Sequence, residues 1–446
     1  MENNEIFSSV TNFHTAFING LDKILSSEDL KPASFNLVFG NAIYHHQERE
    51  FLERLESAKA KLAAAIDPNS TDDDSVIFLK LKDMKLDWQN WTMLEDRKIN
   101  SWNVQLNKFR VLKPRGFSDL LITQVHLPFN GNDFNFNKIS DPTLWSGEII
   151  GRKVSLYYNK FPNKDLQTLL VLDPDQNKEQ FLTEEDHNFV FEMTSSLSRL
   201  YNVSFGYNSL GASASINHLH FHLMIGIEKL PVAEDEWLHN GGSKTYPANI
   251  YVFNNPEESW KLIDKLNQKN VAYNILYLPG KVFIFPRKFM GTYKAVPWST
   301  SFGWLQFSGN FTVYDEDAVN RLTEDIINEA LQDASIKLEE QTGMGTYITI
   351  AKLEDVKEGK PHCVDVEGKS LAVFKVGDEY FATTGICTHA GGPLCQGEIV
   401  NGVVTCPWHG SQFDVKNGKV ERGPAKDPIK TYKLRKTDTT LEADLV

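Results

Sequence analysis

The sequence predicts an α+β domain, with an antiparallel sheet and helices, followed by a smaller all-β domain. Three observations support this fold class. Up to about residue 340, helical spacing of apolar residues alternates with extended apolar runs. Beyond residue 345 the chain holds only short β runs and Gly-rich turns, and all four cysteines lie in this last quarter. A length of 446 residues suits two unequal domains of this kind.

We expect residues 1–95 to form a helical extension of the first domain, residues 96–340 to form its α+β body, and residues 346–446 to form the β domain. The net charge of -13 disfavours non-specific nucleic-acid binding, since an acidic surface repels phosphates. The apolar runs are shorter than the roughly 20 residues of a membrane span, and the N-terminus has no signal-peptide pattern. We therefore expect a cytoplasmic protein with neither nucleic acid nor membrane as a partner.

Periodicity predicts the elements of the first domain in order. One helix is expected to begin at Thr183, because an acidic turn follows this N-cap residue and the apolar positions then share one face. After it, a turn of small residues leads into a strand that contains three histidines. The other elements are helices at about 12–25, 42–65 and 316–337 and strands at 102–106, 120–127, 154–159 and 166–172.

Two cysteine–histidine pairs dominate the C-terminal domain. They are Cys387-Thr-His389 and Cys406-Pro-Trp-His409. Two thiolates and two imidazoles suit an iron–sulfur cluster in which one iron takes both cysteines and the other both histidines. A structural zinc ion held by the same four residues is the alternative. Each segment supplies one residue of each kind, whereas zinc sites usually pair like ligands, so we favour the cluster.

The segments CTHAGGP and CPWHGSQFD, in this order, resemble the two boxes of a Rieske ferredoxin domain. The resemblance implies one [2Fe-2S] cluster held by Cys387, His389, Cys406 and His409, and a redox partner protein. High-potential Rieske proteins join these loops by a disulfide, but the equivalent positions here are Gly392 and Trp408. Phe413 replaces a tyrosine that donates to a cluster sulfur. We therefore expect a reduction potential toward the low end of the Rieske range.

Three histidines, His218, His220 and His222, alternate with apolar residues in the first domain. On a strand they share one face. Such a face suits either a metal ion held by imidazoles or a phosphate site where an imidazole attacks phosphorus. The small-residue loop just before it, which includes Asn208, Ser213 and Ser215, offers N–H and hydroxyl donors to an anion. We favour the phosphate interpretation.

The pattern His-φ-His-φ-His-φ-φ, where φ is an apolar residue, resembles the histidine triad (HIT) superfamily. The resemblance implies a fold like that of the HIT proteins and galactose-1-phosphate uridylyltransferase. The segments FGYNSLGASASINHLHFH, WNVQLNKFRVLKPR and NILYLPGKVFIFPRK resemble the GDP-L-galactose and GDP-D-glucose phosphorylases. This resemblance implies nucleotidyl transfer from a nucleoside-diphosphate sugar to inorganic phosphate, with His220 as the nucleophile. His218 is then expected to orient the His220 ring and His222 to donate to a substrate oxygen. The expected substrate-binding residues are Asn208, Ser213, Ser215, Arg110, Lys113 and Arg115.

Two points stay open at the level of sequence. The transferases and the plant phosphorylases usually carry Gln at the third triad position, where this chain has His222, so the acceptor is phosphate, water or another sugar phosphate. Two other functions also remain. In the first, the histidine face is a mononuclear iron site fed by the Rieske centre, which makes the chain an oxidoreductase. Alternatively, the chain is a ferredoxin-like electron carrier whose first domain binds a nucleotide without catalysis.

Overall fold

The computed structural model describes residues 2–45, 49–83, 93–113, 122–139, 143–226, 228–294, 296–299, 302–338, 347–366, 369–436 and 440–444. The chain forms two compact units, Met1–Lys337 and Leu338–Val446. The first is α+β with a large antiparallel sheet and the second is all-β, which confirms the predicted fold class.

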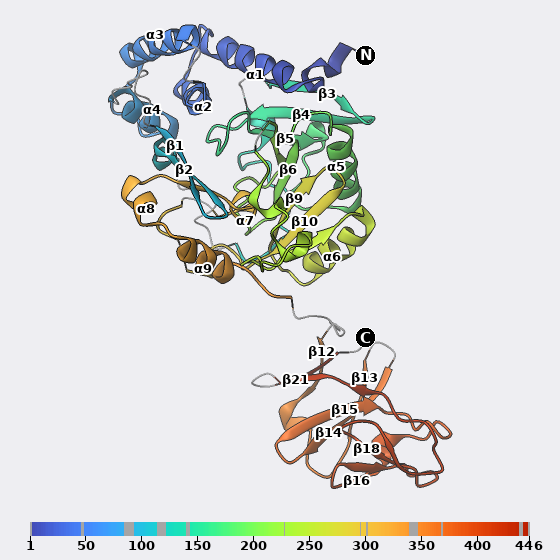
Figure 1. The fold of residues 1–446 in the computed structure, drawn as a ribbon. Coiled ribbons are helices and arrows are strands. Elements are labelled where there is room, and N and C mark those ends of the chain that lie inside the picture. The colour runs from blue at the N-terminus through green and yellow to red at the C-terminus, as the bar shows by residue number, and fades with distance from the viewer. Residues whose placement is uncertain are drawn as a thin grey trace. The chain divides into compact units, whose positions relative to one another are not determined.

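The first unit begins with helices that gather on one side of it (Figure 1). They are α1 (Val10–Leu25), α2 (Pro32–Ala42), α3 (Arg49–Ala65) and α4 (Asp73–Asp83). Helix α1 follows the prediction and is capped by Ser9, whose side chain accepts the N–H of Asn12. The single helix predicted at 42–65 is wrong, because α2 ends at Ala42 and α3 begins only at Arg49.

An eight-stranded antiparallel sheet forms the body of the first unit. Its strand order is β3-β4-β5-β7-β6-β9-β10-β8. Helices α5 and α6 pack together against this sheet (Figure 1). The bounds are β3 (Trp145–Ile149), β4 (Arg152–Tyr158), β5 (Thr168–Leu172), β6 (Ser204–Asn208), β7 (His220–Met224), β8 (Tyr251–Phe253), β9 (Tyr273–Leu278), β10 (Lys281–Pro286), α5 (Glu184–Ser196) and α6 (Pro256–Gln268).

A small sheet of order β1-β2-β11 and three short helices complete the first unit. Strand β11 runs parallel to β2, although the two are far apart in sequence. These elements enclose an apolar core around Trp102, Trp298 and Trp304. Their bounds are β1 (Leu94–Ile99), β2 (Trp102–Asn107), β11 (Asn310–Val313), α7 (Trp304–Phe307), α8 (Glu316–Arg321) and α9 (Glu324–Ala334).

Two further predictions for this unit are wrong. The strand predicted at 120–127 is irregular over 122–127, because the Asn270 side chain, rather than a strand, binds this main chain: it accepts from Val125 N (2.9 Å) and donates to Thr123 O (2.7 Å). Its remaining residues lie outside the described ranges. The helix predicted at 316–337 is divided into α8 and α9. Leu322 is extended, and the Thr323 side chain then caps α9 by accepting the N–H of Ile326.

The second unit consists of three small antiparallel sheets with two apolar clusters between them. The sheet orders are β12-β22-β21, β13-β14-β15-β20 and β16-β17-β18-β19. The bounds are β12 (Tyr347–Lys352), β13 (His362–Val366), β14 (Lys369–Val376), β15 (Glu379–Thr384), β16 (Glu398–Val400), β17 (Val403–Thr405), β18 (Gln412–Asp414), β19 (Val420–Arg422), β20 (Thr431–Tyr432), β21 (Leu434–Lys436) and β22 (Thr440–Asp444).

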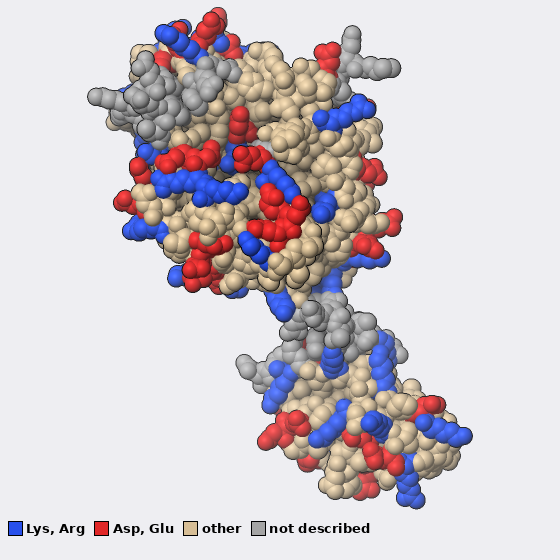
Figure 2. Space-filling model, viewed as in Figure 1, with Lys and Arg blue, Asp and Glu red and all other residues tan. Residues whose placement is uncertain are grey.

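On the face that Figure 2 draws, acidic and basic side chains of the first unit lie next to one another rather than in separate patches. Within the described part of the chain, no helix has the length and apolar character needed to pass through a bilayer.

Candidate functional sites

Strand β7 lies inside the large sheet, between β5 and β6, and its side chains alternate between two faces. Phe221 and Leu223 are fully buried, and Phe221 stands edge-on to Tyr277, which in turn contacts His187 of α5. His220 and His222 point to the opposite face, with ring centroids 5.6 Å apart. Because side chains alternate along β7, the apolar residues face α5 and the two imidazoles face a cavity.

That cavity has a volume of about 420 Å³ and brings together most of the predicted site residues of this unit. Those that line it are His220, His222, Asn208, Ser213, Ser215, Arg110 and Lys113. His218 comes just before β7 and is fully buried beside the cavity, where Phe136 contacts both its ring and that of His220. Arg115 lies outside the described residues.

The tautomer of His220 follows from one hydrogen bond. Its Nδ1 lies 2.7 Å from the main-chain oxygen of His218. A carbonyl oxygen only accepts, so Nδ1 carries the proton and Nε2 keeps its lone pair. The bond that orients the ring therefore comes from the main chain of His218, and not from its imidazole. The His218 ring itself accepts the N–H of Phe136 at Nδ1, 3.2 Å away.

His222 has the complementary tautomer. Its Nδ1 lies 3.2 Å from Nε2 of Gln167. The Gln167 amide can be oriented only one way, because its Oε1 accepts the main-chain N–H of Asn163 at 2.7 Å. Gln167 therefore donates to Nδ1 of His222, which leaves His222 with an Nε2–H donor. Neighbouring rings thus offer the cavity a nucleophilic nitrogen and a hydrogen-bond donor.

Gln180, which is fully buried, fixes the main chain of His220. Its Oε1 accepts the His220 N–H (2.9 Å), and its Nε2 donates to the carbonyls of His220 (3.2 Å) and Asn208 (2.9 Å). The pairing of β6 with β7 ends at Gly206 and His222. The Gln180 side chain thus replaces main-chain hydrogen bonds where these strands separate around the cavity.

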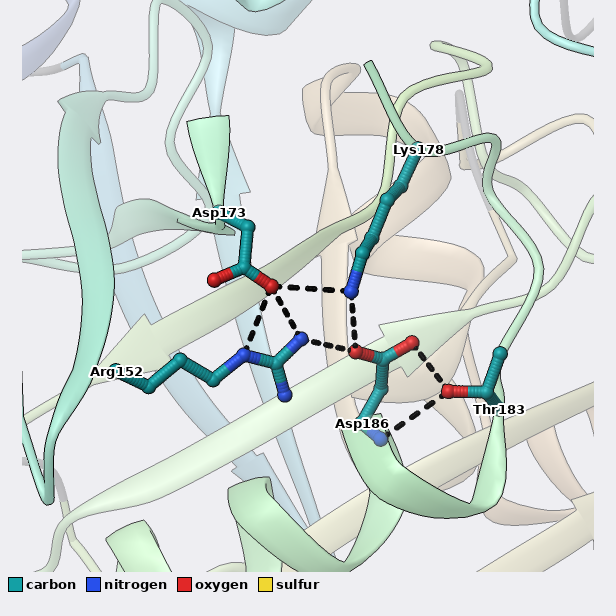
Figure 3. Close-up of polar contacts among 5 residues, drawn as sticks. All are labelled: Arg152, Asp173, Lys178, Thr183 and Asp186. Carbon is teal, nitrogen blue, oxygen red and sulfur yellow. Dashed lines mark hydrogen bonds and ion pairs between the residues drawn. The ribbon is translucent and has the colours of Figure 1, made fainter. Parts of the chain in front are cut away.

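A cluster of charged side chains anchors the loop that carries Gln180 (Figure 3). Arg152 and Lys178 each contact both Asp173 and Asp186; the Lys178 distances are 3.0 and 3.1 Å. Thr183 donates to Asp186 at 2.6 Å and caps α5 as predicted. The Lys178 main-chain oxygen also accepts the N–H of Leu219 (2.8 Å), which ties this loop to the segment entering β7.

Burial keeps the histidines neutral. It lowers the pKa of His218 and of His220 to about 4, and it lowers the pKa of His222 well below its usual value, helped by the charges of His220, Lys113 and Arg110. Burial lowers the pKa of Lys113 to about 7, with the charge of Arg110 as a further cause. At neutral pH the cavity therefore combines uncharged imidazoles with cationic Arg110 and partly protonated Lys113.

The loop between β6 and β7 is held tightly against α7. Asn208 Oδ1 accepts from Asn274 Nδ2 (2.6 Å) and from the N–H of Trp304 (2.9 Å). The Trp304 ring lies so close to Gly206 that any side chain there would overlap it. Ser213 has a φ of 80°, a left-handed conformation that non-glycine residues adopt at a cost. Such strain is common at functional sites, and Ser213 lines the cavity.

Sequence reasoning missed Gln180, Gln167 and the aromatic residues Phe136 and Trp304. Gln167 left a signal, as the single amide in the apolar run 166–172. Gln180 left none, because its partners lie 28 and 40 residues away in sequence.

In the second unit, the two predicted ligand segments form loops of the same hydrogen-bond pattern. The N–H of Cys387 donates to Gly392 O, and that of Cys406 donates to Ser411 O, both at 2.8 Å. Gly391 and Gly410 donate back to the two cysteine carbonyls at 3.0 and 3.1 Å. Both glycines have positive φ (75° and 72°), which this tight turn requires.

The loops bring two buried thiols and two exposed imidazoles together. Cys387 and Cys406 are 3% and 2% exposed, whereas His389 and His409 are exposed and their rings lie 4.8 Å apart. A buried pair of soft sulfur ligands and an exposed pair of nitrogen ligands match the two unlike irons of a two-iron cluster. The donor set therefore fits a [2Fe-2S] group.

The surroundings of the thiols agree with this fit. A side chain at Gly392 would approach Cys406 Sγ to 2.8 Å, so the loops pass too closely for a larger residue. The Ser411 hydroxyl accepts the N–H of Ala425 (3.0 Å) and hydrogen-bonds to the Cys387 thiol. Phe413 is fully buried in the same apolar cluster as both cysteines and has no polar group to offer them.

Two buried thiols and two exposed imidazoles on paired loops of an all-β domain define a two-iron ferredoxin-type protein. Over residues 346–433 the chain matches the Rieske [2Fe-2S] domain family, and it belongs to that family. Its cofactor is one [2Fe-2S] cluster, so the alternative of a structural zinc is set aside. The ferredoxin component of the naphthalene 1,2-dioxygenase system of Pseudomonas putida is 35% identical over 99 residues, 22% of this chain and 95% of that protein. The Sphingomonas yanoikuyae B1 ferredoxin structure is 32% identical and covers 23% of this chain and 100% of its own, with a TM-score of 0.22.

The first unit also has a family match. Residues 99–224, which include all three histidines, match the family described as GDPGP1-like, N-terminal domain. The crystal structure of the yeast Ap4A phosphorylase Apa2 is 18% identical and covers 55% of this chain and 86% of its own, with a TM-score of 0.39. The chain thus combines a GDPGP1-like domain with a Rieske electron-transfer module, as the motifs predicted.

Proposed function

We propose that the first unit transfers the nucleotidyl group of a nucleoside-diphosphate hexose to inorganic phosphate, through a covalent intermediate on His220. One observation carries this proposal. His220 presents an unprotonated Nε2 to a cavity that also contains a neutral donor at His222 and two basic residues, Arg110 and Lys113. A neutral, oriented imidazole beside cationic groups is what attack on an anionic phosphorus centre requires.

In the first step, His220 Nε2 forms a bond to the α-phosphorus, and the bond from that phosphorus to the bridging oxygen breaks. The electron pair leaves with the bridging oxygen as hexose 1-phosphate. The proton on His220 Nδ1 stays in place, and its bond to the His218 carbonyl strengthens as the ring becomes cationic. The Nε2–H of His222 donates to a non-bridging oxygen, where negative charge increases.

In the second step, an oxygen of inorganic phosphate attacks the same phosphorus, the N–P bond breaks, and a nucleoside diphosphate leaves. Arg110 and Lys113 supply the positive charge for the two anions, and Ser213 and Ser215 supply hydroxyl donors from the loop before the histidines. Asn208 lines the same cavity, but its Oδ1 is already bonded to Asn274 and Trp304. Only its amide nitrogen is therefore assigned to the substrate.

The Rieske domain supplies one-electron transfer when its cluster is bound. We assign Cys387 and Cys406 to one iron and His389 and His409 to the other. The exposed imidazoles, next to a Trp408 side chain that is 56% exposed, then form the surface through which a redox partner protein exchanges the electron. The first unit's reaction is redox-neutral, so the two activities are measured separately.

The test is product analysis with GDP-D-glucose, supplied with and without inorganic phosphate. We expect GDP and glucose 1-phosphate when phosphate is present, and at most one equivalent of glucose 1-phosphate per chain when it is absent. Release of GMP with water alone would instead assign hydrolysis. His220→Ala should abolish turnover, while His126→Ala, an exposed histidine paired with Glu179 at 3.1 Å, should not change it. Wild-type turnover by the His220→Ala variant would overturn the proposal.

A further inference from the structure

Helices α1–α4 precede both matched families, since the first family match begins at residue 99. Two of these helices nevertheless form a wall of the cavity that holds His220 and His222. Ala33 and Leu37 of α2 and Asp74 of α4 line it, together with residues of the loop 159–163 that follows β4. The helical extension is therefore part of the site and not a separate appendage.

The extension fixes this loop through its main-chain carbonyls. Asn41 of α2 donates to the carbonyl of Asn159 at 2.9 Å, and Tyr44 donates to that of Pro162 at 3.3 Å. Between them, Arg110 donates to the carbonyl of Phe161 at 2.7 Å. A side chain at Gly40 would overlap the Lys160 carbonyl, so α2 packs directly on the loop. Direct contacts thus join the helical extension to loop 159–163 in the cavity wall.

An ion pair lies on this wall. Lys160 Nζ lies 2.8 and 2.9 Å from the two carboxylate oxygens of Asp74, and Asn36 donates to the Asp74 main-chain oxygen at 2.8 Å. The two side chains are still 32% and 28% exposed. Both line the cavity, so their remaining lone pairs and N–H groups are available to a ligand.

Two amide groups on the cavity lining also lack a partner. Asn163 Oδ1, an acceptor, and Gln306 Nε2, a donor, are buried with no hydrogen-bond partner among the described residues. Gln306 is only 2% exposed, and its Oε1 is already bonded to the N–H of Gly303. A buried polar atom without a partner is destabilising, and a polar ligand in the cavity would satisfy it.

Another part of the cavity lining is apolar. Phe136, Ile139, Leu169 and Ile216 belong to one cluster that lines the cavity. A flat nucleobase suits such a surface, whereas a carboxylate, an ammonium group and two amides suit adjacent hydroxyls that both donate and accept. The Asp74–Lys160 pair has no net charge, unlike Arg110 and Lys113, and is therefore better suited to a polyol than to phosphate.

We infer that Asp74 and Lys160 bind the hexose hydroxyls of the substrate, so that the helical extension forms the sugar subsite. This inference rests on the proposed function and adds to it the group that selects the leaving sugar phosphate. Sugar hydroxyls that bridge Asp74 and Lys160 would make a nucleoside-diphosphate hexose a better substrate than an ester of the same nucleotide whose leaving group has no hydroxyls.

The test compares two substrates that transfer the same nucleotidyl group: GDP-D-glucose and the p-nitrophenyl ester of GMP, whose leaving group has no hydroxyls. We expect Asp74→Asn and Lys160→Met each to lower kcat/KM for GDP-D-glucose about 10- to 100-fold, the effect of losing one charged hydrogen bond. The nitrophenyl ester should change less than about twofold, since it makes no use of this wall.

Asp175→Asn and Lys153→Met are matched controls. This pair, 3.6 Å apart and 80% and 65% exposed, lies outside the cavity lining and should leave both substrates unaffected. Equal losses for both substrates in Asp74→Asn would assign the pair a structural role, and unchanged GDP-D-glucose turnover would exclude it from sugar binding. Either result overturns the inference.

Binding keeps this inference separable from the proposed function. If the protein turns over neither substrate, the proposed function fails, but titration calorimetry still compares GDP-D-glucose with GDP. Tighter binding of the sugar nucleotide, lost in Asp74→Asn and kept in Asp175→Asn, would support the sugar subsite. Equal affinity for GDP-D-glucose and GDP in the wild-type protein would contradict it.

Discussion

Replacing Gln180 by leucine tests whether the main chain of His220 is held by a single side chain. Leucine keeps much of the volume but removes three hydrogen bonds, to the His220 N–H, the His220 carbonyl and the Asn208 carbonyl. At about 1 kcal/mol each, the first unit should lose about 3 kcal/mol of unfolding free energy. The same change frees β7 to shift toward β6, and a displacement of about 1 Å at a reacting group costs about 100-fold in rate.

The assay is single-turnover release of glucose 1-phosphate from GDP-D-glucose, with denaturant unfolding measured in parallel. We expect the rate of the chemical step to fall about 100-fold while the substrate concentration for half-saturation changes little, because Gln180 does not line the cavity. Gln268→Leu, on the exposed face of α6, is the matched control and should change neither quantity. A variant that loses stability but keeps the wild-type rate would refute the positioning role of Gln180.

Three further predictions concern groups around the two centres. Gln167→Leu removes the donor that fixes the tautomer of His222, so kcat should fall about tenfold while KM stays unchanged. A tenfold rise in KM with unchanged kcat would show that Gln167 acts on binding instead. Because the pKa of His220 is about 4 and that of Lys113 about 7, kcat/KM should fall below about pH 4, where His220 becomes protonated, and above about pH 7, where Lys113 loses its charge. Lys113→Arg should move the alkaline limb to higher pH, and an unmoved limb would assign it to another group. Phe413→Tyr should raise the reduction potential of the cluster by about 40 mV, the equivalent of one hydrogen bond of about 1 kcal/mol to a cluster sulfur. Redox titration with EPR detection measures this potential, and a lowered value would contradict the prediction.

The sequence predicted those features that depend on residues close together in the chain. The alternation of His218, His220 and His222 predicted that all three share one face of a strand. The structure has His220 and His222 on one face of β7, and His218 just before it. Thr183 predicted the start of α5. The two cysteine–histidine segments predicted the Rieske family for the same reason, since each loop closes on itself within five residues.

Features that depend on distant contacts were not predictable in this way. Gln180 lies in an ordinary polar loop, and only the fold brings its amide between β6 and β7. Asp74 belongs to a helix that no motif singled out, yet it lies on the same cavity as His220. The strand expected at 120–127 failed for a related reason: an amide from Asn270 takes the main-chain hydrogen bonds that a neighbouring strand would have used.

The central claim is that His220 Nε2 attacks the α-phosphorus, because its other nitrogen is held protonated by the His218 carbonyl. The most direct measurement is to mix the protein with GDP-D-glucose without phosphate, quench at alkaline pH, and locate the adduct by peptide mass spectrometry. We predict an acid-labile GMP group on the peptide containing His220, and no such group in His220→Ala. When phosphate is added before the quench, the GMP group should be released as GDP. A GMP group on any other residue, or rapid turnover with no adduct in the wild-type protein, would contradict the account.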